Sequence, residues 1–215
     1  MKFVLFYLAL TTTFSYSTNE IYYWHLEKNE NGIKVYSRPL KDFNFNEVRV
    51  VNKVKSNLSG IVGVLLDTKN YPKWVHGCIA TTTLKVLNDQ EIYNYSITDL
   101  PWPLNDRDVV SNFTVSQDPI TLVVTCSKIG MSDYIPEKEG LVRVLNFKSI
   151  TTLTPLPGDS VLIELEMHLD ARVNAPDWIV NENLLGGPYY STLSMLKRIP
   201  LYQSAYYYFI KEDSK

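Results

Sequence analysis

Short segments with β-strand character, separated by turn signals, fill most of this chain and constrain its fold more than any other feature. Segments rich in β-branched and aromatic residues alternate with turn signals such as Asn88-Asp89 and Asp118-Pro119. They predict strands over 33–37, 47–55, 81–86, 91–98, 109–115, 121–127, 141–152 and 161–169. Because short turns join consecutive strands, we expect the sheet to be antiparallel.

Two segments have helical rather than strand periodicity. The first, 58–67, places apolar residues at helical spacing and should pack one side inward. The second covers 175–199, with Pro176 near its first turn. Its apolar face is wide enough to cover a sheet and consists of Trp178, Leu185, Tyr189, Leu193 and Leu196. Because proline inside a helix removes a hydrogen bond, we expect a kink at 186–188. Two interpretations stay open: a moving lid, and an ordinary core helix with a kink.

The first residues have the pattern of an export signal. Lys2 precedes an apolar run, 3–10, that is too short to span a bilayer, and Ser15 and Ser17 supply small residues for a cleavage site. We therefore expect 1–17 to be a signal peptide, and the protein to be exported and periplasmic or secreted. The alternative interpretation is a buried N-terminal strand.

The rest of the chain, 18–215, contains no repeat, low-complexity tract or linker, so we expect a single domain with a sizeable core. Twenty-one basic and 23 acidic residues give no support for nucleic-acid binding, which needs a clustered basic surface. Cys78 and Cys126 are the only cysteines, which excludes a four-cysteine zinc site. Both lie in apolar strand-like contexts, so buried free thiols are expected in preference to a disulfide. No cofactor is implied.

Three segments resemble, in order and separation, the START (StAR-related lipid-transfer) domain family and especially its phosphatidylcholine-transfer branch. Residues 101–108 are similar to the family's aromatic-proline run that leads into an Arg-Asp pair, here Arg107-Asp108. Residues 136–144 resemble the end of its gating loop and the strand that follows, and 175–181 the opening of its lid helix. The resemblance covers about residues 24–200.

This resemblance implies an α+β helix-grip fold, in which a curved antiparallel β-sheet wraps around a long C-terminal α-helix and encloses an internal hydrophobic cavity. It also implies a monomeric, non-enzymatic protein that binds one lipid or other hydrophobic small molecule and makes transient membrane contact. Two alternatives stay open: an enzyme of the same superfamily acting on a hydrophobic substrate, and an interaction protein that displays the tyrosine-rich C-terminus.

Arg107 is the first candidate ligand contact. In the phosphatidylcholine-transfer branch the matching arginine is associated with the ligand phosphate, and a guanidinium group suits phosphate well. The alternative is a structural ion pair with Asp99, Asp106 or Asp108. The 129–140 loop is expected to act as a gate. The other expected contacts are Asn94, Val109, Ser111, Phe113, Met131, Tyr134, Trp178, Leu185, Tyr189 and Leu193.

The sequence leaves the ligand and one strand face open. Phe113 stands where the cholesterol-binding branch has a second arginine, and 120–128 lacks the aromatic residues of a choline cage. Neither sterol nor phosphatidylcholine is therefore carried over. Which face of 91–98 lines the cavity is undetermined.

The best enzymatic constellation is Glu164, Glu166 and His168, which share one strand face as a metal or acid–base cluster requires. Because the opposite face is plainly apolar, a solvent-facing polar side explains the same pattern without chemistry.

Overall fold

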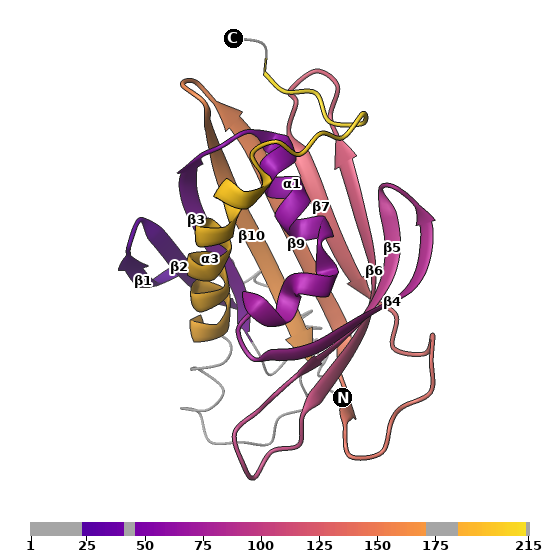
Figure 1. Cartoon of the computed structure of the whole chain (residues 1–215). Coiled ribbons are helices and arrows are strands. Elements are labelled where there is room, and N and C mark those ends of the chain that lie inside the picture. The colour runs from indigo at the N-terminus through magenta and orange to yellow at the C-terminus, as the bar shows by residue number, and fades with distance from the viewer. Residues whose placement is uncertain (1–22, 41–45, 171–184, 214–215) are drawn as a thin grey trace, which may run out of the picture.

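The computed structural model describes residues 23–40, 46–170 and 185–213, and these form one curved antiparallel sheet with helices on one side (Figure 1). Ten strands are present in the described residues: β1 (His25–Glu30), β2 (Ile33–Pro39), β3 (Asn46–Lys55), β4 (Cys78–Asn88), β5 (Glu91–Thr98), β6 (Arg107–Gln117), β7 (Val124–Gly130), β8 (Val142–Arg143), β9 (Leu145–Leu156) and β10 (Ser160–Asp170). The helices are α1 (Leu58–Leu66), α3 (Gly187–Arg198) and the short 3-10 turns η1 (Thr68–Lys73) and η3 (Ile199–Tyr202).

The order of strands in the sheet is β1-β2-β3-β10-β9-β7-β6-β5-β4. After β3 the chain crosses by way of α1 and η1 to the far edge at β4, and then returns strand by strand until β10 pairs with β3. The sheet does not close, because β1 and β4 are its two ends. The predicted helix-grip fold is thereby confirmed.

The strand predictions succeeded where period-2 alternation extends through a whole strand, as at 91–98. The expected strand 121–127 is displaced to Val124–Gly130, because the Asp118 carboxylate accepts hydrogen bonds from the backbone of Ile120 and Thr121 at 2.9 and 2.7 Å and holds a turn. The expected strand 141–152 is divided in two: β8 pairs in parallel with β6, whereas β9 lies between β7 and β10 and pairs with both in antiparallel fashion. The polar β1 was not predicted.

Helix α1 is buried on nearly every side, which explains its almost uniformly apolar sequence. It lies between the sheet and the C-terminal segment, and the ring of Tyr202 comes so near Gly63 that a Cβ there would lie 3.0 Å from it. Asn57 caps the helix through Oδ1, which accepts from the Gly60 amide at 2.9 Å. The carboxylate of Glu212 accepts from the backbone amides of Leu58 and Ser59, both at 2.8 Å.

Helix α3 covers the other part of the same sheet face, against β2 and β3. Its apolar residues join Ile33, Val35, Val48 and Val50 in a second core cluster. Pro188 stands in its first turn, where proline is tolerated. Residues 171–184 lie outside the described residues, so the expected start of this helix at 175 stays a prediction. The expected kink at 186–188 is described only from residue 185 onward, where α3 begins at Gly187, so it stays a prediction as well.

Candidate functional site

The two faces of the sheet are distinguished by the alternation along β7, β9 and β10. Cys126 of β7, Leu153 of β9 and Ile163 of β10 belong to the main core cluster, which also includes α1. These three residues therefore mark the inner face of the sheet, which is turned toward α1 and α3. Every second residue along each strand, counted from them and from their cross-strand partners, lies on this face. The residues between them form the outer face.

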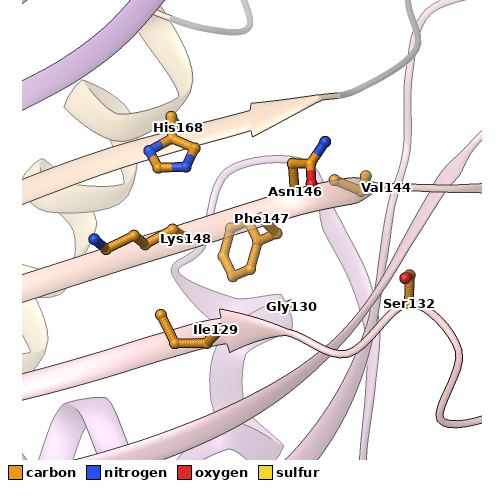
Figure 2. A pocket seen from close by; sticks show the side chains of 8 residues that line it. All are labelled: Ile129, Gly130, Ser132, Val144, Asn146, Phe147, Lys148 and His168. Atoms are coloured by element: carbon orange, nitrogen blue, oxygen red, sulfur yellow. The ribbon is translucent and has the colours of Figure 1, made fainter. Parts of the chain in front are cut away.

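A hollow of about 330 Å³ lies on the outer face (Figure 2). Ile129, Lys148 and His168 are direct neighbours across three strands, and Figure 2 shows them one above another along one wall. The lining is Ile129, Gly130, Ser132, Val144, Asn146, Phe147, Lys148 and His168. Because this hollow is on the side opposite the core cluster, it is distinct from the predicted internal cavity, and sequence reasoning did not anticipate it.

Three of the predicted contacts meet on the inner face. Asn94 and Ser111 are directly paired across β5 and β6, each 5 % exposed, and Phe113 follows Ser111 on the same face at 1 %. This settles the face of 91–98: Asn94 points inward and Tyr93 and Tyr95 outward. Asn94 Oδ1 has no hydrogen-bond partner among the described residues.

A second inner-face asparagine was missed by the sequence analysis. Asn52 is paired with Ile33 and Ile163, both core residues, and is itself 3 % exposed. Neither its amide nitrogen nor its oxygen has a partner among the described residues. Because buried polar atoms are costly without hydrogen bonds, the inner face can accept polar atoms of a bound molecule at these two asparagines.

Arg107 and Val109 continue the inner-facing series along β6. Arg107 is 6 % exposed, and its guanidinium donates to the carbonyl of Asn105. Burial lowers the pKa of Arg107, while the negative charge of Asp106 raises it. One contact of the arginine is therefore with the loop that precedes β6, next to the inner face.

Asp108, one of the predicted partners of Arg107, pairs instead with Arg143. Arg143 Nε and Nη2 donate to the two carboxylate oxygens, each at 3.0 Å, and both side chains are almost fully buried. The same guanidinium donates to the carbonyls of Ser132, Ile135 and Pro136. This ion pair fastens the 131–141 loop to the sheet.

The fastened loop covers the outer face of β5. Tyr134 packs edge-on against Tyr93 with ring centroids 5.0 Å apart, and the Lys138 ammonium lies 4.1 Å from the centre of the Tyr95 ring. Met131, half-buried at the start of the loop, donates its backbone N–H to Val110. The structure therefore does not bring Tyr134 together with Asn94, Ser111 and Phe113.

The predicted contacts of the last helix lie on the β2–β3 half of the inner face. Tyr189 is 3 % exposed, and its hydroxyl accepts from the Asn31 amide at 2.7 Å. Leu185 and Leu193 pack beside it against the same cluster. Trp178 lies outside the described residues.

Lys128 is an inner-face residue that the sequence analysis missed. It is directly opposite Phe113, with its ammonium 5.0 Å from that ring's centre and 4.2 Å from the centre of the Tyr71 ring. It donates to the Tyr71 hydroxyl at 2.6 Å, and that hydroxyl donates in turn to the Leu65 carbonyl at 2.5 Å. Burial lowers the pKa of Lys128 to about 8. The available signal was a lysine on the strand face that otherwise carries Val124 and Cys126.

The acidic constellation on β10 belongs to the outer face. Glu164 and Glu166 both pair with Arg49, and His168 Nδ1 lies 3.9 Å from a Glu47 oxygen. Within the described ranges, no three His, Cys, Asp or Glu side chains are grouped as a metal site requires. Cys78 and Cys126 are buried and unbonded, as predicted.

A family model, a curated relative and solved structures match this chain. The family model described as START domain matches residues 18–188. An uncharacterized protein of Pseudomonas aeruginosa is 28% identical over 165 residues, which are 77% of this chain and 81% of the relative. A STAR-related lipid transfer protein from Xanthomonas axonopodis is 28% identical, with a TM-score of 0.73 over 82% of this chain and 98% of that one. Human StAR-related lipid transfer protein 5 has a TM-score of 0.71 at 18% identity, over 83% and 86%. In the part of the chain that is described, no helix has the length and apolar character to cross a membrane.

Proposed function

Because the chain belongs to the START domain family, we propose that it binds one lipid or other hydrophobic molecule between the inner face of the sheet and the helices α1 and α3. The observation that carries this proposal is a pair of inner-face asparagines: both polar side-chain atoms of Asn52, and Oδ1 of Asn94, are buried and lack partners among the described residues. Apolar burial drives the binding, at about 0.8 kcal/mol for each methylene group, and the asparagines orient the polar atoms of the ligand.

The proposal does not extend to a particular lipid. The matched family model and the solved structures do not single out the phosphatidylcholine-transfer branch. The binding is non-enzymatic in this proposal, because the best acid–base constellation of the sequence lies on the outer face, in ion pairs with Arg49 and Glu47.

Native mass spectrometry of protein purified from its own cells tests the proposal. We expect one copurified hydrophobic molecule per chain. A matched pair of variants locates it: Ser111→Leu adds bulk on the inner face, and Thr114→Leu adds bulk on the outer face of the same strand. Ser111→Leu should lose the copurified molecule and Thr114→Leu should retain it. Wild-type protein without any bound molecule, and without affinity for a fluorescent fatty-acid probe, would contradict the proposal.

We also propose export, on the strength of the N-terminal pattern alone, since 1–17 lies outside the described residues. N-terminal sequencing of the protein from its own cells should begin near Thr18. A retained Met1 would overturn this proposal.

A further inference from the structure

Besides Arg107 at the start of β6, the inner face carries a cation in an apolar setting, Lys128, and no acidic side chain of the described residues forms an ion pair with it. Lys128 lies opposite Phe113 on one neighbouring strand and Ser149 on the other. Its ammonium has one polar contact in the described residues, the neutral hydroxyl of Tyr71, and none of the ion pairs found there includes it.

The titratable groups around Lys128 are neutral at pH 7. Burial raises the pKa of Cys126 to about 12, and it also raises the pKa of Cys78 and, strongly, that of Tyr71. The charge of Asp67 acts on Tyr71, but the Asp67 carboxylate accepts hydrogen bonds from Asn70 and Tyr202. Lys128 is half-buried, and a charge in an apolar setting without a counter-charge is costly. A pKa of about 8 nevertheless leaves most of the lysine protonated at pH 7.

Hydrogen-bond donors are in excess at this position. The proton of the Tyr71 hydroxyl goes to the Leu65 carbonyl, so the hydroxyl only accepts from Lys128 and two ammonium protons remain. Trp74 packs edge-on against Tyr71 with centroids 5.1 Å apart, and its buried indole N–H has no acceptor among the described residues. A cation and a second free donor beside one tyrosine are complementary to an anionic oxygen.

We propose that Lys128 binds the anionic head of the ligand, a carboxylate or phosphate attached to a hydrophobic chain, inside the fold. This inference rests on the proposed function and names its ligand class, an anionic amphiphile. The apolar rings of Phe113 and Tyr71 lie beside the hydrophobic chain. The anionic head supplies the counter-charge that no described residue gives to the ammonium. Anion binding in turn raises the pKa of Lys128, because a nearby negative charge favours the protonated form.

Three ligands with the same chain test the inference: oleate, oleyl phosphate and oleyl alcohol. Calorimetric titration at pH 7 should give tighter binding of the two anions than of the alcohol. Lys128→Met should weaken the anions by about 10- to 100-fold, the range for a hydrogen bond to a charged group, and leave the alcohol within about threefold. Lys148→Met, which removes a lysine from the outer face of the next strand, should change none of the three. Inorganic phosphate alone should bind far more weakly than oleyl phosphate.

The outcomes separate this inference from the proposed function. If none of the three amphiphiles binds the wild type, the proposed function fails. If all three bind and Lys128→Met changes the affinity for the two anions and for the alcohol by the same factor, the lysine has no role in head-group binding, while the proposed function stands. Inorganic phosphate binding as tightly as oleyl phosphate would replace the amphiphile by a free anion and overturn the inference.

A second measurement needs no variant and so remains valid if Lys128→Met does not fold. Protein labelled with ¹³C at lysine side chains is titrated by NMR with and without oleate. The pKa of Lys128 should rise from about 8 toward or above the ordinary lysine value when oleate is bound. An unchanged pKa in the presence of bound oleate contradicts the inference.

Discussion

Replacing Arg143 by methionine removes the buried cation that fastens the 131–141 loop. The side chains of Arg143 and Asp108 are 0% and 1% exposed, so neither charge is solvated when its partner is lost. The variant leaves a buried carboxylate unpaired and deprives the carbonyls of Ser132, Ile135 and Pro136 of their donor. Breaking such a pair costs about 3–5 kcal/mol, which for a domain of this size lowers Tm by roughly 6–20 °C.

The assay is urea unfolding followed by fluorescence and circular dichroism, with native-state hydrogen exchange to locate the effect. Exchange should accelerate in the 131–141 loop before the rest of the sheet. Lys28→Met is the control, because Lys28 and Glu30 form a surface pair with side chains 33% and 60% exposed, and such pairs contribute at most about 1 kcal/mol. Arg143→Lys should fall between the two, because lysine keeps the charge and loses the planar fork. A loss below about 1 kcal/mol for Arg143→Met would refute the reasoning.

Three further predictions concern the interior and the first helix. Lys128→Met should be more stable than the wild type at pH 7, by at most about 3 kcal/mol. Because the folded-state pKa of Lys128 is lowered to about 8, the unfolded wild-type chain binds more protons than the folded one between pH 8 and the ordinary lysine pKa, and the wild type becomes more stable as the pH rises. The stability difference should therefore shrink when unfolding is measured up to pH 10.5, and a constant difference would contradict the prediction. Cys126 and Cys78 should react with a thiol reagent at least about 100-fold more slowly in the native protein than in urea, because both are buried with raised pKa values; equal rates would show that the thiols are accessible. Asn57→Ala should lower the free energy of unfolding by about 1 kcal/mol, because it removes the cap on the Gly60 amide. Asn57→Ser should keep most of this stability, and equal losses in the two variants would argue against the cap.

Much of the fold could be predicted because its signals are local. Alternation located 91–98 to the residue, helical spacing located 58–67 within one residue, and the apolar context of the two cysteines correctly indicated buried thiols. Where two local signals competed, the predicted boundary was wrong: because of the Asp118 turn, β7 starts three residues later than predicted.

The candidate site was predicted only in part. Asn94, Ser111 and Phe113 do meet on one face, because residues of one strand keep their alternation wherever the strand is placed. Tyr134 could not be placed, since a loop carries no period that tells which face of the sheet it will cover.

By itself, the sequence determined most of the secondary structure, the antiparallel sheet and the family, since turn signals, periodicity and motifs are properties of short segments. Only the tertiary structure decided which charges are compensated. Asp108 and Arg143 are 35 positions apart, and their pairing depends on the loop between them folding back over the outer face. Lys128 and Tyr71 are 57 positions apart and meet because η1 lies against the inner face of β7. The free energy of a charge depends on the partners and the solvent around it, and the sheet order, which joins distant segments, sets both.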